Sequence, residues 1–181
     1  MANKDKITLG SGKLYCVEYA GTIPEDATIE TEENRLGYVS GGATLEYAPT
    51  YYEAKDDLGY VSKTILTQEE AKLKSGVMTF NGDTLTRLCS TGRVTETDGK
   101  RTVLIGGAGN QDGKSYIIRF LHEDPVDGDV RVTIVGRNEA GFSLSYAKDK
   151  ETVIDAEFKA LAKLDTEGTL IKYEETIPTE G

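Results

Sequence analysis

Residues 114–136 read KSYIIRFLHEDPVDGDVRVTIVG and contain two strand-like segments with a turn between them. Segments 114–121 and 129–136 are rich in β-branched and aromatic residues, which are typical of strands. Asp127-Gly128, just before the second segment, is a turn-forming dipeptide. We therefore expect two strands here, joined by a short connection.

The same alternation of apolar and polar residues recurs on both sides of this stretch. Pro49 indicates the edge or the end of a strand. Two hairpins are expected, one around Thr67-Gln68-Glu69-Glu70 and one around the Gly-rich connection that ends at Asp112-Gly113. With the two strands above, at least seven short strands result, which indicates a mainly β chain forming a β-sandwich or a partly closed barrel. The further expected strands are residues 44–52, 59–66, 71–79, 101–106 and 141–147.

One short α-helix is expected to flank the sheet. Leu85, Leu88 and Cys89 share one helical face after Asn81-Gly82-Asp83, and Gly92 suits the position after the helix. Asp83 or Thr84 is the expected N-cap of this helix of about three turns. Residues 151–164 fit either a strand or a helix, because their alternation favours the first and their Ala, Leu, Lys and Glu content the second. Residues 20–43 are polar with little periodicity, so a long loop is expected there.

Composition limits the class of protein. The 181 residues have a formal net charge of −10, and no segment approaches the ~20 apolar residues that a membrane helix needs. The acidic excess argues against tight binding of nucleic acid, which needs surplus Lys and Arg. The charge is uneven, because residues 18–57 hold ten acidic residues against Arg35 and Lys55. That segment is either a solvated, soluble surface or one that repels polyanions or meets a basic partner.

The motifs that suggest catalysis or ligand binding do not hold up. Residues 108–115 fit a relaxed phosphate-loop pattern, but a strand-like segment follows where the mechanism needs a helix. The acidic turn 124–129 fails the spacing of a calcium loop. His122 is expected to be a structural residue at a strand end, and Cys16 and Cys89 to be free thiols. We therefore expect no enzyme activity, no cofactor and no metal.

The tyrosines at positions 47, 51, 52 and 60 lie within one region that we expect to be a hairpin. They are either one half-buried face of a sheet or an interaction surface, since Tyr is enriched at interfaces.

Several stretches resemble the major tail tube proteins of long-tailed, siphovirus-like double-stranded DNA phages and prophages. The resemblance covers roughly residues 7–175 and is one of overall pattern. The stretches that carry it are residues 41–47 (GGATLEY), 74–82 (KSGVMTFNG), 88–93 (LCSTGR), 118–125 (IRFLHEDP) and 148–158 (KDKETVIDAEF).

The resemblance implies a tail-tube-like β-sandwich or barrel with one flanking helix, in which residues 151–160 form a strand. It implies a single domain over residues 1–181, with an N-terminal arm at 1–13 and a C-terminal tail at 165–181, which is acidic. Six copies would form a ring, and stacked rings a hollow tube that conducts the genome during ejection. The arm, a hairpin loop around residues 48–60 and the tail would contact other subunits.

On this reading, the candidate inter-subunit contacts are Lys4, Lys6, Tyr51, Tyr52, Lys55, Asp56 and Asp57, and the candidate lumen acids are Glu46 and Glu53. The implied partners are other copies, the tape-measure protein, the tail terminator and distal tail proteins, and double-stranded DNA that passes without sequence-specific binding. No membrane partner is expected. The subunits would assemble in the bacterial host cytoplasm and end in the virion tail.

Two other readings remain open at this stage. The tube of a contractile tail or of a secretion-type injection system shares the same architecture. A monomeric β-sandwich that binds the host surface is the alternative from another class, although the chain lacks Trp, the residue best suited to sugar stacking.

Overall fold

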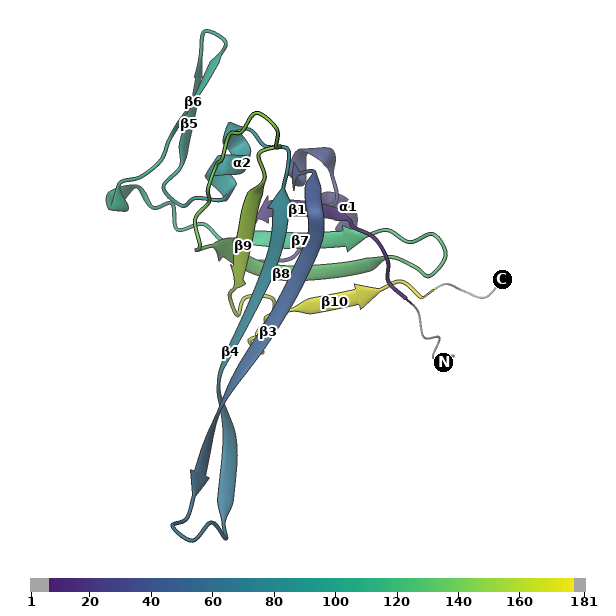
Figure 1. Cartoon of the computed structure of the whole chain (residues 1–181), viewed down its shortest axis with the longest axis vertical. Coiled ribbons are helices and arrows are strands. Elements are labelled where there is room, and N and C mark those ends of the chain that lie inside the picture. Colours follow the sequence, from purple (N-terminus) through teal and green to yellow (C-terminus); the bar gives the residue numbers. More distant parts are fainter. Residues whose placement is uncertain (1–6, 178–181) are drawn as a thin grey trace.

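The computed structural model describes residues 7–177, and the chain is mainly β with short helices, as the sequence predicts. Its strands are β1 (Lys13–Glu18), β2 (Arg35–Gly37), β3 (Val39–Lys55), β4 (Ser62–Val77), β5 (Arg93–Thr97), β6 (Lys100–Leu104), β7 (Tyr116–His122), β8 (Val130–Asn138), β9 (Ile154–Ala160) and β10 (Lys172–Glu175) (Figure 1). Its helices are α1 (Asp26–Ile29), α2 (Gly82–Arg87) and 3₁₀ turns at Glu32–Asn34 and Ala108–Asn110.

Eight strands form one antiparallel sheet in the order β2-β1-β7-β8-β9-β4-β3, with β10 beside β8. The strand β8 is shared, because Val130–Thr133 pair with β10 and Gly136–Asn138 pair with β9. At this junction a Cβ on Gly136 would lie 2.1 Å from the carbonyl oxygen of Lys159, so the two strands meet as closely as backbones allow. Figure 1 shows β7 and β8 crossing β9, β4 and β3 at a steep angle.

The main core lies between the two halves of this bent sheet. Leu14, Ile118 and Ile134 from the β1-β7-β8 half pack with Leu73 and Phe158 from the β4-β9 half, and all five are essentially inaccessible to solvent. The arrangement is sandwich-like rather than a closed barrel, since within residues 7–177 the end strands β2 and β3 do not pair.

A second, smaller core covers the opposite face of β1, β7 and β8. Ile29 of α1 packs there on Tyr15, Ile117, Leu121 and Val135. The expected long loop at 20–43 is therefore wrong in part, because the segment contains α1, a 3₁₀ turn, β2 and the start of β3. Ile29 and Leu36 are its buried anchors, too few to give a visible period in the sequence.

The expected helix exists, but it is shorter and is capped differently. α2 has six residues, and the side chain of Asn81 accepts hydrogen bonds from the backbone N–H groups of Asp83 and Thr84 at 2.9 and 3.2 Å. The helix ends at Arg87 with Leu88 as its C-cap, so Gly92 lies beyond its end. The N-cap is thus Asn81, two residues before Asp83 and three before Thr84, the two predicted caps.

Two of the expected hairpins are wrong. Residues 62–77 form one continuous strand, and polar Thr67–Glu70 continue it because this part of the hairpin is largely exposed to solvent. β6 pairs with β5 rather than with β7, which lies between β1 and β8. The connection of residues 105–115 is too long for a tight hairpin, and it crosses to a different sheet.

Of the remaining sequence predictions, some are confirmed and others are wrong. The strands at 114–121 and 129–136 are confirmed as β7 and β8, and the strand within 151–160 as β9. Residues 141–147 are not a strand, although Phe142 and Leu144 pack against the core. In the C-terminal tail, residues 172–175 join the sheet as β10. Residues 1–6 of the predicted N-terminal arm and residues 178–181 of the predicted C-terminal tail lie outside the described residues.

Candidate assembly surface on the β3–β4 hairpin

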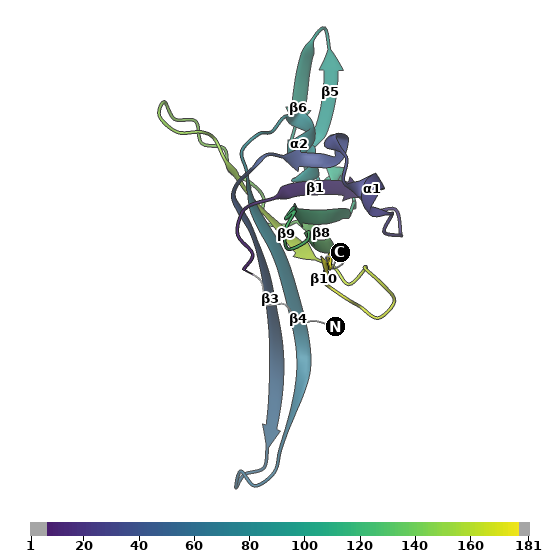
Figure 2. The ribbon, with the colours of Figure 1, turned by 90° about the vertical axis from the view of Figure 1, so that its right-hand side faces the viewer.

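The β3–β4 hairpin extends far beyond the body of the protein. The two strands pair from Val39↔Val77 to Lys55↔Ser62, whereas β9 pairs with β4 only over residues 72–77. Residues 47–69 therefore form a two-stranded projection, which Figure 2 shows as a long arm on one side of the body. Their described side chains are exposed throughout.

Local contacts keep this arm extended. Tyr47 donates a hydrogen bond from its hydroxyl to Glu69 Oε1 across the strands at 2.6 Å. At the turn, Asp56 accepts hydrogen bonds from the backbone N–H groups of Val61 at 2.7 Å and Leu58 at 3.3 Å. Gly59 has a φ of +72°, which favours glycine at that position. The arm is thus a hairpin with a structured turn.

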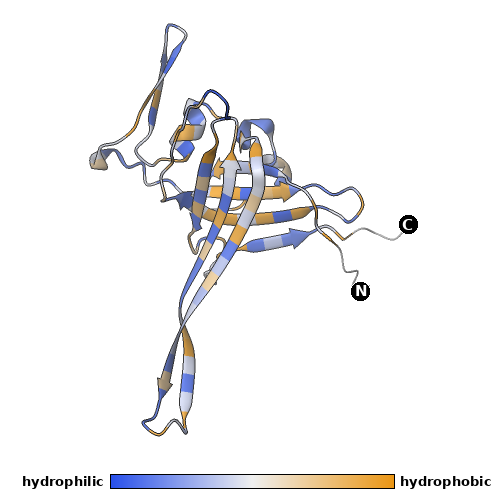
Figure 3. Ribbon diagram, in the orientation of Figure 1, coloured by the Kyte–Doolittle hydropathy of each residue, from blue (hydrophilic) through white to orange (hydrophobic). Residues whose placement is uncertain are grey.

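The outer end of the arm, residues 51–66, which we call the tip, exposes apolar side chains on both faces. Tyr51 pairs with Leu66 and Tyr52 with Ile65, so successive pairs point to opposite faces. Tyr51 and Tyr52 are 60% and 59% exposed. Leu58, Tyr60 and Val61 at the turn are exposed more fully still. Figure 3 shows the resulting hydrophobic bands in the outer part of the arm.

The outer edge of β3 has no partner strand among residues 7–177. Seventeen residues of backbone therefore present N–H and C=O groups along one edge, interrupted by Pro49. Natural proteins usually protect so long an edge with charge, bulges or a covering element, because it can pair with another chain. The pairing of β3 with β4 has two register shifts, and β3 carries Pro49 and one basic side chain, Lys55, but no element among residues 7–177 covers this edge. An apolar tip and a free edge together are typical of a surface that is covered on assembly.

The outer face of the β3-β4-β9 layer carries charges of alternating sign, and we call it the charged face. Lys74 contacts Glu46 at 2.9 Å and Glu157 at 3.5 Å, and Lys72 contacts Glu157 at 3.0 Å. The line continues through Lys72–Glu70, Lys159–Glu70, Lys159–Glu139 and Arg137–Glu139.

These pairs favour the charged form of each partner. The hydrogen bonds of Glu157 and Glu70 raise the pKa of Lys72, and that of Glu46 raises the pKa of Lys74. The same contacts with Lys72 lower the pKa of Glu70 and of Glu157. The charged face is therefore close to self-neutralised, and its lysines are engaged.

The acidic excess of residues 18–57 does not persist as one acidic surface in the fold. Glu18 is paired with Lys114 at 2.8 Å, Glu32 with Arg35 at 2.5 Å and Glu46 with Lys74. The basic partners lie elsewhere in the chain in most cases. The sequence therefore overstates how strongly the charge is segregated in three dimensions.

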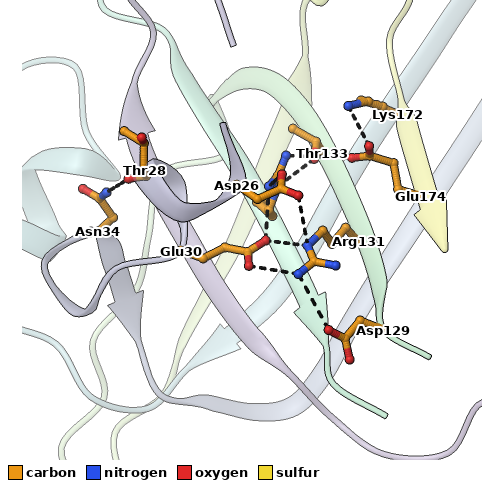
Figure 4. Close-up of polar contacts among 10 residues, drawn as sticks. Asp26, Thr28, Glu30, Asn34, Asp129, Arg131, Thr133, Lys172 and Glu174 are labelled. Atoms are coloured by element: carbon orange, nitrogen blue, oxygen red, sulfur yellow. Dashed lines mark hydrogen bonds and ion pairs between the residues drawn. The ribbon is translucent and has the colours of Figure 1, made fainter. Parts of the chain in front are cut away.

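A cluster of arginine–carboxylate pairs around the buried Arg119 fixes α1 to the sheet (Figure 4). Arg119 on β7 is 1% exposed, and it contacts Asp26 and, at 3.1 Å, Glu30. Arg131 on β8 reaches Glu30 at 2.7 Å, and Arg119 Nε donates to Thr133 Oγ1 at 3.0 Å. The hydrogen bond from Arg119 lowers the pKa of Asp26. Buried charges need such partners, so this cluster has a structural explanation.

The predicted site residues are brought together in part. Tyr51, Tyr52, Lys55, Asp56 and Asp57 all lie in the tip. Lys4 and Lys6 lie outside the described residues. Glu46 belongs to the charged face, whereas Glu53 is seven positions further along β3 and points by alternation to the other face, where it contacts Lys55 at 3.3 Å.

Sequence reasoning missed the apolar half of the tip. Ile65 and Leu66 were expected in a strand, and Leu58 and Val61 near its start, but none was singled out as a contact residue. Apolar residues in a strand normally indicate burial. The available signal was their position beside the turn-forming residues Asp56, Asp57 and Gly59, at the end of a long hairpin that has no body to pack on.

The motifs rejected from sequence also have structural explanations. The 108–115 loop leads into strand β7, and Lys114 is held by Glu18. His122 ends β7 with its Nδ1 at 2.7 Å from the Ser11 carbonyl oxygen. Burial raises the pKa of the Cys16 thiol to about 12, and both cysteines are free. Among residues 7–177, no three His, Cys, Asp or Glu side chains are grouped as metal ligands would be.

No family model and no curated protein matches this sequence. Within residues 7–177, no helix is both long and apolar enough to cross a bilayer.

Proposed function

We propose that this protein is the tube subunit of a phage tail: six copies form a ring, and stacked rings form a hollow tube. The observation that carries the proposal is the β3–β4 arm, with an apolar tip on both faces and a 17-residue free edge. In a monomer, such an edge and such a tip would be an aggregation hazard. The arm supports self-assembly in general, and the resemblance of residues 7–175 to siphovirus-like tail tube proteins is the reason for proposing a phage tail tube in particular.

The expected contacts between subunits follow from the arm. Tyr51 and Tyr52 with Ile65 and Leu66 would supply the apolar centre of a contact, and Asp56 and Asp57 its polar rim. Aromatic residues surrounded by polar ones are the usual composition of an interface core. Lys4 and Lys6 of the N-terminal segment are the other proposed contact residues.

The proposed cargo is the double-stranded genome, which passes through the lumen without being gripped. Glu46 and Glu53 remain the candidate lumen acids, with Glu46 on the charged face and Glu53 on the opposite one. The pairing of Lys72 and Lys74 with glutamates supports weak DNA contact, since engaged lysines are poorly available to phosphates. The tape-measure protein, the tail terminator and the distal tail proteins are the other proposed partners. The proposed location is the virion tail, after assembly in the host cytoplasm.

Electron microscopy and sedimentation velocity of the purified full chain test the proposal. We expect rings or tubes with a central channel at high protein concentration. The variant Y52S/I65S should raise the concentration needed for assembly roughly 100-fold, as for the loss of about 3 kcal/mol at an interface centre. The matched control Y146S changes another exposed tyrosine, outside the arm, and should assemble normally.

A persistent monomer at every concentration and salt tested would contradict the proposal and favour a monomeric host-surface binding module. If Y52S/I65S assembles normally, the chain still self-assembles, but the tip is not part of the contact between subunits. Tubes surrounded by a contractile sheath in the parent virion would instead identify the contractile-tail or injection-system variant of the same architecture.

A further inference from the structure

The β5–β6 hairpin is a second projection, separate from the main sheet. β5 and β6 pair only with each other among residues 7–177, from Arg93↔Leu104 to Thr97↔Lys100. Their turn is Asp98-Gly99, with φ values of +52° and +72°, as in the tight turns that suit twisted hairpins. In Figure 1 this hairpin and the tip of the β3–β4 arm lie at opposite ends of the longest axis.

One face of the hairpin rests on α2. A Cβ on Gly82 would lie 2.8 Å from Arg101 Cδ and 2.8 Å from Val103 Cγ2, so glycine lets these side chains sit against the start of the helix. Arg101 also contacts Asp83 at 3.5 Å. Both Arg101 and Val103 alternate onto the same face of β6. The hairpin is therefore held at a defined position relative to the body.

The other face of the hairpin is uncovered. It carries Arg93, Thr95 and Thr97 on β5, opposite Leu104, Thr102 and Lys100 on β6. Every residue of β5 is exposed, and Leu104 and the following Ile105 are about half exposed. A two-stranded hairpin with one uncovered face is marginal by itself, so a partner that covers this face would stabilise it.

The charges at the two ends of the molecule indicate what that partner is. In the described part of the chain, Arg93 and Lys100 have no ion-pair partner, and Asp98 is the nearby acid. The tip of the β3–β4 arm carries three acidic and two basic residues, and one acid, Glu53, is paired with Lys55. One end is thus locally basic and the other locally acidic, and each exposes apolar side chains.

We propose that the β5–β6 hairpin is a docking arm whose occupant is the β3–β4 tip of another copy of this chain. The contact is heterologous, because it joins two different surfaces of identical subunits, and such contacts build either a closed ring or an open stack. The two projections lie at opposite ends of the longest axis, which favours the stack. Lys100 would lie near the acids of the neighbour's turn, and Leu104 and Ile105 would contact its apolar side chains. This inference rests on the proposed function, since it names the second surface that self-assembly uses.

Charge reversal at each end tests the inference. The variant K100E reverses a charge on the docking arm, and D57K reverses one at the tip while keeping Asp56, which holds the turn. Each single variant should raise the concentration for assembly about tenfold, since like charges then meet. The double variant K100E/D57K, and an equal mixture of the two single variants, should return to the wild-type concentration. Circular dichroism of the monomers should show unchanged folding.

The control K148E reverses an exposed lysine outside both projections, and it should assemble as the wild type does. If the wild-type chain assembles and K100E assembles equally well, the inference that the β5–β6 hairpin binds the tip of another copy is overturned. The proposed function is then unaffected. If both single variants fail and the double variant is not restored, the two ends do not meet and the inference is also overturned. If the wild-type chain never assembles, the proposed function fails, and this inference fails with it.

Discussion

Arg119 Nη1, on the buried side of β7, donates a hydrogen bond to Glu30 Oε1 at 3.1 Å, immediately after α1. Asp26, at the start of α1, contacts the same guanidinium. A four-residue helix has little stability of its own. The buried arginine therefore holds α1 at both ends and keeps Ile29 over the second core.

Replacing Arg119 with Met should destabilise the fold by about 1.5–3 kcal/mol, because Glu30 and Asp26 lose its charged hydrogen bonds and keep only Arg131 as a basic partner. Urea denaturation followed by circular dichroism measures this loss. The control K114M breaks the exposed Lys114–Glu18 pair and should cost no more than about 1 kcal/mol. Equal losses in the two variants would mean that Arg119 contributes no more than a surface charge.

The stability of the protein should fall at acid pH in part through Asp26. The hydrogen bond from Arg119 lowers the pKa of this carboxyl below its ordinary 3.8. Its contribution is therefore fully present above the unfolded value and is lost as the pH falls through the folded one. The difference in unfolding free energy between the wild type and D26N should shrink on going from about pH 5 to about pH 3. A difference that is constant over this window would show that Asp26 is not the group responsible.

The cap of α2 should contribute measurably to stability. Asn81 satisfies the N–H groups of Asp83 and Thr84, so N81A should cost about 1 kcal/mol. N81D keeps an acceptor at the same place and should be nearly neutral. Thermal unfolding of the two variants side by side gives the comparison, and an equal loss would point to the amide N–H₂ rather than to the cap.

The corner between β8 and β9 should not tolerate a side chain at Gly136. A methyl group there would meet the Lys159 carbonyl oxygen at 2.1 Å, far inside contact distance. We expect G136A to lose at least about 2 kcal/mol, with a lower urea midpoint. The control G109A places its methyl group in open space and should stay within about 0.5 kcal/mol of the wild type. A stable G136A would mean that the corner can open.

The sequence predicts the body of this protein better than its projections. β7 and β8 are visible from it because Ile117, Ile118, Ile134 and Val135 bury both faces of a continuous apolar run. Strand partners are less accessible, because pairing depends on residues far apart in the chain. The sequence prediction contains no turn at Asp98-Gly99 and places a hairpin at Asp112-Gly113 that does not form, because a turn dipeptide does not state which strands it joins.

The tip was predicted only through its tyrosines and charges. Ile65 and Leu66 are not distinguishable by type from core residues such as Ile134, and only the fold shows that they extend beyond the body. Cross-strand pairs such as Glu46–Lys74 are equally invisible before the register of β3 and β4 is known. The acids of residues 18–57 therefore looked more isolated in the sequence than they are in the fold.

The way in which β4 enters the body also determines how the arm would bear a mechanical load. Residues 72–77 of β4 pair with β9 along the same strand that continues outward as the arm. Hydrogen bonds of antiparallel strands are perpendicular to the strand direction. A pull on the tip is therefore applied in shear, and the whole row of bonds must yield together instead of one at a time. If the hairpin were attached at a right angle, the same pull would break these hydrogen bonds one after another. In the observed geometry the arm should resist a pull along its axis more strongly.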